Sequence, residues 1–454
     1  MHQNRSFLVW MIAFIALQPV VDVLTTISAG SSITAGIVLR FLYMAAMIVI
    51  VLMMMRKSRM AKIFFWYLAG LAALIAINLG VNLAVKDPYL LFEELKFFNK
   101  VVYLHIVLFG LILIYRQLVA MGDDVMERTK KMFFYSSLII SFVFIVSLIT
   151  GTSLENYRWS KIGFTGWFYA GNEIGAIMAI IIPVVAMVAI HQMTSWKKWY
   201  VWIPFVLFAF SMQMLGTKVG YGAVIIALAA SVLAVGWQHF MVEKKAKWKA
   251  NLGMLAVLFA LTAVTSPFTP TFHNVGAHID LLEIDWGQSS SDPEDPEAPE
   301  EDAPEEDEGV TSEQMQNLIF SSREVYLQDF VDDFASAPLL QQMFGMGFAG
   351  NYEVDERPTM IEMDYYDIFF SFGIIGFIYF MAPIIFFLFL IAKRLITRFK
   401  ETMTIDNILW GTSLVLALGI GAMAGHVFTA PAVTIYFAAG LAVVLVNNRL
   451  IKVK

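Results

Sequence analysis

The chain has 454 residues, of which 59% are hydrophobic and only 15% are charged. A soluble domain is nearer half apolar and a quarter charged, so this composition excludes an ordinary soluble enzyme, and the lack of cysteine excludes disulfides and a thiol nucleophile. The net charge of −6 is local, because Asp292–Glu308 holds eleven of the 37 acids and the remaining 26 are outnumbered by 31 bases.

Apolar stretches long enough to cross a bilayer recur along most of the chain. Twelve are expected, at about 7–29, 34–55, 63–84, 98–115, 132–150, 171–190, 200–216, 219–237, 250–266, 367–391, 406–424 and 431–448. We interpret the first as a retained helix, because further spans follow it without a small-residue cleavage site. The sequence therefore predicts an all-α polytopic membrane protein with about twelve transmembrane helices.

The connections between these stretches alternate in basic charge. One set carries 22 lysines and arginines, and the other set, with the adjoining helix ends, carries nine. The nine are Arg40, Lys86, Lys96, Lys100, Arg158, Lys161, Lys218, Arg323 and Arg357. Because strongly basic connections stay in the cytoplasm, both termini are predicted to be cytoplasmic and the nine bases to face outward.

The longest connection, residues 267–366, is then extracytoplasmic, and it separates helices 1–9 in residues 1–266 from helices 10–12 in residues 367–454. Its segment 289–309 is rich in Pro, Asp and Glu and has too little apolar surface to fold, so we expect it to be disordered. Residues from about 313 to 335 have the periodicity of an amphipathic helix.

Three of the outward lysines lie at the ends of apolar stretches. Lys96 and Lys100 are four residues apart, and a solvated ion-pair face explains them about as well as ligand binding does. Lys218 lies in LGTKVGYG, a tight connection whose glycines allow close approach of backbone or ligand. A lone lysine at a helix end is more often an interfacial anchor. Lys100 and Lys218 are nevertheless taken as candidates for substrate binding.

The outer connection YRWSKIGFTGWFYAGNEIG supplies Arg158 and Lys161, followed by Asn172 and Glu173 where the next stretch begins. Asn172 is in a position to cap that helix. Glu173 is harder to explain structurally, because an acid inside a membrane segment is costly and usually paired. Arg158, Lys161, Asn172 and Glu173 are therefore candidates for substrate binding.

Arg323 lies at the centre of the apolar stripe of the predicted amphipathic helix, where an unpaired charge is costly. One interpretation is that its guanidinium extends to a lipid phosphate or a loop carbonyl. The other is that it binds an anion in a cavity roofed by this helix. We favour the second interpretation and take Arg323 as a catalytic and substrate-binding candidate.

Acidic residues gather at the outer mouth of the tenth stretch, in MIEMDYYDIFFSFGIIGF. One of Glu362 and Asp364 is a candidate general base, while its neighbours, including Asp367, hold bases or cap the helix. His426, in AGHVFTAPA at another outer mouth, is a rival base or a substrate ligand, although packing in a turn is the commoner role. His105, within the fourth stretch, is interpreted as structural.

The sequence has no dinucleotide or Walker phosphate loop, no HExxH zinc site and no GxSxG elbow. Its seven histidines are scattered, which does not suggest a metal cage. We therefore expect a metal-independent reaction without a cofactor, in which arginine and lysine neutralise phosphate, and we expect no nucleic-acid partner.

Four segments resemble the O-antigen ligase and O-antigen polymerase superfamily of bacterial membrane glycosyltransferases. The segments are GFTGWFYAGNEIGA, LGTKVGYGA, SREVYLQDFVDDFASAPLLQQMFGMGFAG and IEMDYYDIFFSFGIIGF. They place Arg323 on a family arginine and Lys218 where arginine is common. Glu362 stands where the ligases have histidine, and Asn172 follows glycine instead of proline, which favours a polymerase-like or Gram-positive branch.

The resemblance implies a GT-C-like membrane enzyme that joins polyprenyl-diphosphate-linked oligosaccharides at the outer face of the bacterial cytoplasmic membrane. An acceptor hydroxyl of a glycan attacks the anomeric carbon, and the diphosphate leaves. Other polysaccharide-assembly proteins are implied as further partners. Two alternatives stay open, which are a ligase that transfers a finished glycan and a flippase that transports a lipid-linked glycan.

Overall fold

A computed structural model describes residues 5–30, 34–157, 161–281, 323–352 and 358–451. Its longer helices are α1 (Arg5–Ile27), α2 (Ala35–Met55), α3 (Arg59–Val85), α4 (Leu91–Ala120), α5 (Val125–Thr150), α6 (Gly171–Gln192), α7 (Ile203–Met214), α8 (Lys218–Trp237), α9 (Ala246–Thr265), α10 (Pro270–Leu281), α12 (Arg323–Ser336), α14 (Asp364–Thr397), α16 (Ile405–Met423) and α17 (Pro431–Asn447). Two short helices are α13 (Leu339–Phe344) and α15 (Phe399–Thr402). In the described ranges the strands are β1 (Leu154–Glu155) and β2 (Phe164–Gly166), which pair antiparallel with Leu154 opposite Gly166.

Each of the twelve predicted stretches falls on a helix, and the predicted all-α membrane fold is confirmed. Ten helices of the described chain are long and apolar enough to span a bilayer. The exceptions are α17, with 17 residues, and α7, with 12 residues after a 3₁₀ segment over Trp196–Trp202. At 1.5 Å per residue, α7 is about 18 Å long, which is less than the roughly 30 Å hydrocarbon core.

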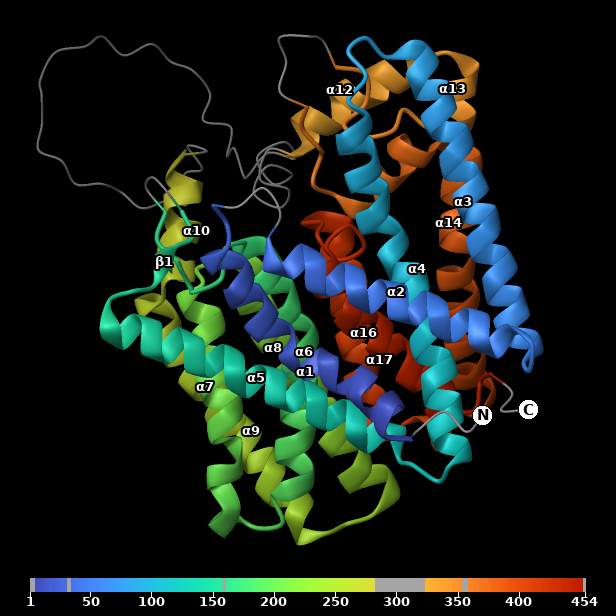
Figure 1. The fold of residues 1–454 in the computed structure, drawn as a ribbon. Helices are drawn as coiled ribbons and strands as arrows, with labels where there is room; N and C mark the ends of the chain where they lie inside the picture. Colours follow the sequence, from blue (N-terminus) through green and yellow to red (C-terminus); the bar gives the residue numbers. More distant parts are fainter. Residues whose placement is uncertain (1–4, 31–33, 158–160, 282–322, 353–357, 452–454) are drawn as a thin grey trace, which may run out of the picture.

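The centre of the bundle is formed by α4, α6 and α17, and α17 packs against both of the others (Figure 1). Nearly every residue of α6 from Ile174 to Ile190 is buried, and so is most of α4. These helices are apolar on all sides, as expected for helices surrounded by other helices. By contrast, α2 and α3 expose much of their apolar surface, which is the pattern of helices at the lipid boundary.

The two ends of the bundle carry different polar contacts. At one end, Arg5 contacts Asp123 at 2.5 Å, the His191 ring nitrogen lies 2.5 Å from Asp406, and Arg394 donates to the Asn448 carbonyl. These contacts join connections that the charge count places in the cytoplasm. The other end holds α12 and α13, at the top of Figure 1 beside the upper ends of α3 and α4. Which end faces the cytoplasm stays a prediction.

The segment between α9 and α14 contains helices that the sequence analysis did not place. After α9, the chain continues as α10, and α13 follows α12 within a region rich in turn residues. The predicted amphipathic helix is present as α12, which begins at Arg323 where the description resumes. The acidic segment 289–309 and residues 313–322 lie outside the described residues.

Buried polar side chains of α3 and α4 hold the chain after α13 in place. The Asn78 amide nitrogen donates to the carbonyls of Phe344 and Ser371, at 2.6 and 2.8 Å. Lys86 pairs with Glu94 at 2.7 Å, and both contact the backbone of Phe348. Burial lowers the pKa of Lys86, while the Glu94 carboxylate opposes this effect. This network fixes the start of α4 relative to the segments near α12 and α14.

Candidate functional site

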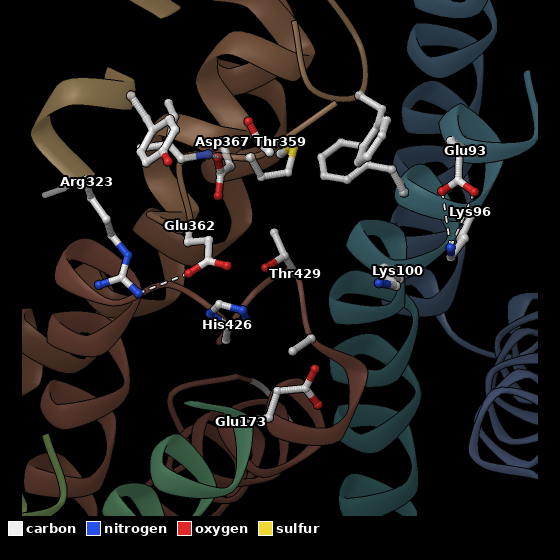
Figure 2. Close-up of a pocket in the computed structure, with 16 residues that line it drawn as sticks. Glu93, Lys96, Lys100, Glu173, Arg323, Thr359, Glu362, Asp367, His426 and Thr429 are labelled. Carbon is white, nitrogen blue, oxygen red and sulfur yellow. Dashed lines mark hydrogen bonds and ion pairs between the residues drawn. The ribbon is translucent and has the colours of Figure 1, made fainter. Parts of the chain in front are cut away.

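Five distant parts of the chain surround a cavity of about 650 Å³ at the end of the bundle that holds α12, which we call the outer cavity. Its polar lining consists of Glu93, Lys96, Lys100, Glu173, Arg323, Tyr326, Thr359, Glu362, Asp367, His426 and Thr429. They come from α4, the start of α6, α12, the chain leading into α14, and the turn before α17 (Figure 2). A concave site with converging charged groups is the usual form of a ligand-binding site.

Arg323 and Glu362 form an ion pair on one side of this cavity. The Arg323 guanidinium lies 3.1 Å from a Glu362 carboxylate oxygen, with 18% of the arginine side chain and 49% of the glutamate side chain exposed. Figure 2 shows both side chains beside His426. The pairing offsets the cost of a charge on the apolar stripe of α12. The guanidinium is therefore placed where it can meet an anion in the cavity.

Two residues of this wall have left-handed backbone conformations that only glycine adopts easily. Glu362 has φ of 64° and His426 has φ of 66°. Such conformations cost about 1–3 kcal/mol each and cluster at active sites. The two turns are also in backbone contact, since a Cβ added at Gly425 would lie 2.4 Å from the Glu362 carbonyl oxygen. Glu362 and His426 are thus held beside each other by strained, close-packed turns.

Asp364 holds the turn that contains His426 in place. One of its carboxylate oxygens accepts from the His426 N–H and the Thr429 hydroxyl, at 3.0 and 2.7 Å. The other accepts from the N–H groups of Val427 and Phe428, at 2.7 and 2.8 Å. The side chain is fully buried and does not line the cavity. Its geometry is that of a positioning residue, so we no longer take Asp364 as the general base.

This arrangement predicts that Asp364→Asn destabilises the protein. The new amide places an N–H₂ group among three backbone N–H donors, and each buried donor left unsatisfied costs about 1–3 kcal/mol. We expect a lower unfolding midpoint in detergent and less than about a tenth of normal transfer. The matched control is Asp332→Asn on exposed α12, which should change neither. Normal stability and activity of Asp364→Asn would contradict the positioning role.

The imidazole of His426 is oriented by the backbone. Its Nδ1 lies 3.1 Å from the Ala424 carbonyl oxygen, which can only accept a hydrogen bond. When the ring is neutral, this contact assigns the proton to Nδ1 and leaves a lone pair on Nε2. His426 lines the cavity beside Glu362, so it is a second candidate for the general base.

The opposite wall carries two lysines of α4. Lys96 pairs with Glu93 at 3.1 Å, and both side chains are partly exposed, so this pair contributes little stability. Lys100 is exposed toward the cavity (Figure 2), and Glu173 lies at the cavity floor in that view. The structure therefore brings Lys100, Glu173, Arg323, Glu362 and His426 to one cavity, as the sequence analysis proposed for each separately.

Other predicted site residues lie elsewhere. Lys218 begins α8, and neither Lys218 nor Lys161 lines the outer cavity. Asn172 is exposed and does not cap α6, whose N-cap is Ala170 with no side-chain cap. Arg158 lies outside the described residues.

The sequence analysis missed a charged pair near the cavity. Asp22 of α1 and Arg40 of α2 form an ion pair that is largely buried, and Gln18 accepts a further bond from Arg40 at 3.2 Å. Arg40 was counted among the outward bases, but Asp22 was not considered. An acid within an apolar span was the available signal, because such a residue is costly unless it is paired or functional.

The described residues contain no group of three or more His, Asp or Glu placed to hold a metal ion, and metal independence stays a prediction. A comparison with protein families finds that the model described as O-antigen ligase like membrane protein matches residues 3–450. No curated protein matches the chain.

Proposed function

Because the chain belongs to the O-antigen ligase-like family of membrane proteins, we propose that it is a glycosyltransferase acting on a polyprenyl-diphosphate-linked oligosaccharide. Family membership supports glycan transfer at a membrane. The observation that carries the finer proposal is the outer cavity, in which Arg323 pairs with Glu362, a candidate base that a strained turn holds beside His426.

In the proposed reaction, an acceptor hydroxyl of a glycan attacks the anomeric carbon of the donor sugar. A new glycosidic C–O bond forms as the bond between the anomeric carbon and the phosphate oxygen breaks, and the diphosphate leaves with that electron pair. Glu362 takes the hydroxyl proton. Arg323 stabilises the negative charge that develops on the leaving diphosphate, through paired N–H donors that carry charge at every working pH.

We propose a polymerase-like enzyme in the extracytoplasmic assembly of a surface polysaccharide, with an O-antigen-type ligase as the alternative. Glu362 in place of the ligases' histidine favours the polymerase. A flippase is the alternative from another class. It is less well supported, because transporter sites lie near the bilayer midplane, whereas the outer cavity, which holds Arg323 and the candidate bases, lies at the end of the bundle.

The experiment that tests this function uses purified protein in lipid nanodiscs with a polyprenyl-diphosphate-linked repeat unit. A glycosyltransferase should give longer lipid-linked glycans and free polyprenyl diphosphate, and Arg323→Ala should give neither. Deletion of the gene separates the alternatives, because single lipid-linked repeat units accumulate when a polymerase is lost and finished long chains accumulate when a ligase is lost. Absence of any transfer with wild-type protein and its native donor would contradict the proposal.

A further inference from the structure

A second cavity adjoins the outer cavity within the bundle. This side cavity, of about 400 Å³, lies among α1, α2, α4, α6 and the start of α17 and contains the Asp22–Arg40 pair. It shares Lys96, Lys100 and Glu173 with the outer cavity. The two α4 lysines therefore stand at the junction of two spaces that together reach from the outer end of the bundle toward its lipid-facing side.

A third space lies between α2, α3 and α4, next to the side cavity. This apolar groove has a volume of about 700 Å³ and shares Asn99 with the side cavity. In its lining only Asn99 is polar, and the rest is apolar, including Leu52, Leu68 and Ala72. Leu52 and Ala72 are exposed in the described fold, and α2 runs obliquely across α4 toward α3 (Figure 1). The groove therefore faces the hydrocarbon of a surrounding bilayer.

Charge changes along this series of spaces. The outer cavity is lined by the acids Glu93, Glu173, Glu362 and Asp367 and by three cationic residues, Lys96, Lys100 and Arg323. In the side cavity the balance reverses, with three bases against Asp22 and Glu173. The apolar groove carries no charge. An anion is thus favoured at the lysine junction, while hydroxyl-rich sugars suit the outer cavity, where carboxylates and Tyr326 offer hydrogen bonds.

We propose that the apolar groove, the side cavity and the outer cavity form one binding path for a prenyl-phosphate-linked glycan. The prenyl chain lies in the groove, the lipid-side phosphate binds Lys100 near Asn99, the sugar-side phosphate extends toward Arg323, and the sugars occupy the outer cavity. This inference rests on the proposed function and adds the route by which the lipid-linked substrate reaches the site. Lys100 makes no ion pair among the described residues, so its ammonium is available to a phosphate.

The groove is tested by filling it. Ala72→Trp places a large ring in the space assigned to the prenyl chain, and Ala73→Trp places the same ring on the neighbouring exposed position that does not line the groove. For Ala72→Trp we expect KM for the long-chain polyprenyl donor to rise about tenfold or more, with little change for a farnesyl-linked donor. Ala73→Trp should leave both KM values unchanged. If the KM of Ala72→Trp for the long-chain donor equals that of wild type, the groove assignment is wrong.

The junction is tested by Lys100→Gln, which removes the charge and keeps an unbranched polar side chain. Binding of polyprenyl diphosphate to the protein in nanodiscs should weaken at least about tenfold, while inorganic diphosphate alone should bind weakly to both proteins. Strong binding of inorganic diphosphate that Lys100→Gln abolishes would indicate a free-anion site and overturn the lipid route. If Arg323→Ala abolishes transfer but neither Ala72→Trp nor Lys100→Gln changes donor binding, the route is wrong and the proposed function stands. If wild type shows no transfer, the function itself fails.

Discussion

Arg323→Lys is expected to reduce glycan transfer about 100- to 1000-fold, which is the loss typical for one donor that stabilises transition-state charge. A guanidinium donates two parallel bonds to a phosphate, whereas an ammonium acts as a point charge and cannot reproduce that fork. We therefore expect Arg323→Lys to be nearly as inactive as Arg323→Ala. The measurement is the initial rate of lipid-linked product formation in nanodiscs, at equal protein content.

A matched control is Arg128→Lys, because Arg128 also pairs with a carboxylate, Asp123 at 2.6 Å, but lies at the other end of the bundle. This change should leave the transfer rate within about twofold, since partly exposed ion pairs contribute about 0–1 kcal/mol. If Arg323→Lys retains near-normal transfer, Arg323 acts as a surface charge that contacts lipid headgroups, and its assigned role in the site is wrong.

Most of the fold could be predicted from the sequence, because each transmembrane helix is determined by its own stretch of apolar residues. A continuous apolar stretch satisfies its own backbone hydrogen bonds in lipid, so its position is readable without knowledge of its neighbours. The structure differs from the prediction where the packing of other helices decides the conformation of a segment. Helix α7 is short and follows a 3₁₀ segment, and α10 lies in the connection after α9, where no helix was predicted.

The candidate site was accessible only in part, because it is assembled from segments far apart in the chain. Unusual residues such as Glu173 and Arg323 could be recognised singly, since a charge on an apolar helix face requires an explanation. Their meeting in one cavity could not be derived from spacing. Lys218 matched a family position and was a candidate for substrate binding, yet it lines neither the outer nor the side cavity.

The role of Asp364 shows the same limit at short range. In the sequence, Glu362 and Asp364 are two residues apart and chemically equivalent. In the structure they differ completely, because the left-handed turn at Glu362 exposes its carboxylate to the cavity while Asp364 begins α14 beneath it. Four hydrogen bonds to the 426–429 turn then occupy Asp364. The deciding contact is with residues more than 60 positions away, which a single sequence does not reveal.

The choice of base therefore falls between Glu362 and His426, which line the same wall. Glu362 uses one carboxylate oxygen for Arg323, and this contact orients the group and leaves the second oxygen to take a proton. His426 has its Nδ1 engaged with the Ala424 carbonyl, which leaves Nε2 as the proton acceptor. Both therefore satisfy the geometry of a general base. We assign the proton transfer to Glu362, because its pairing with Arg323 couples the base to the group that meets the leaving diphosphate.

Glu362→Gln is accordingly expected to reduce kcat about 100- to 10,000-fold, which is the usual contribution of a general base. The amide oxygen still accepts a bond from Arg323, so KM for the donor should change little. In the companion variant, His426→Gln, the amide can still contact the cavity but cannot act as a base, and we expect a loss below about tenfold. The pair of variants separates the two assignments, since a large loss for His426→Gln with a small loss for Glu362→Gln would transfer the role of base to His426.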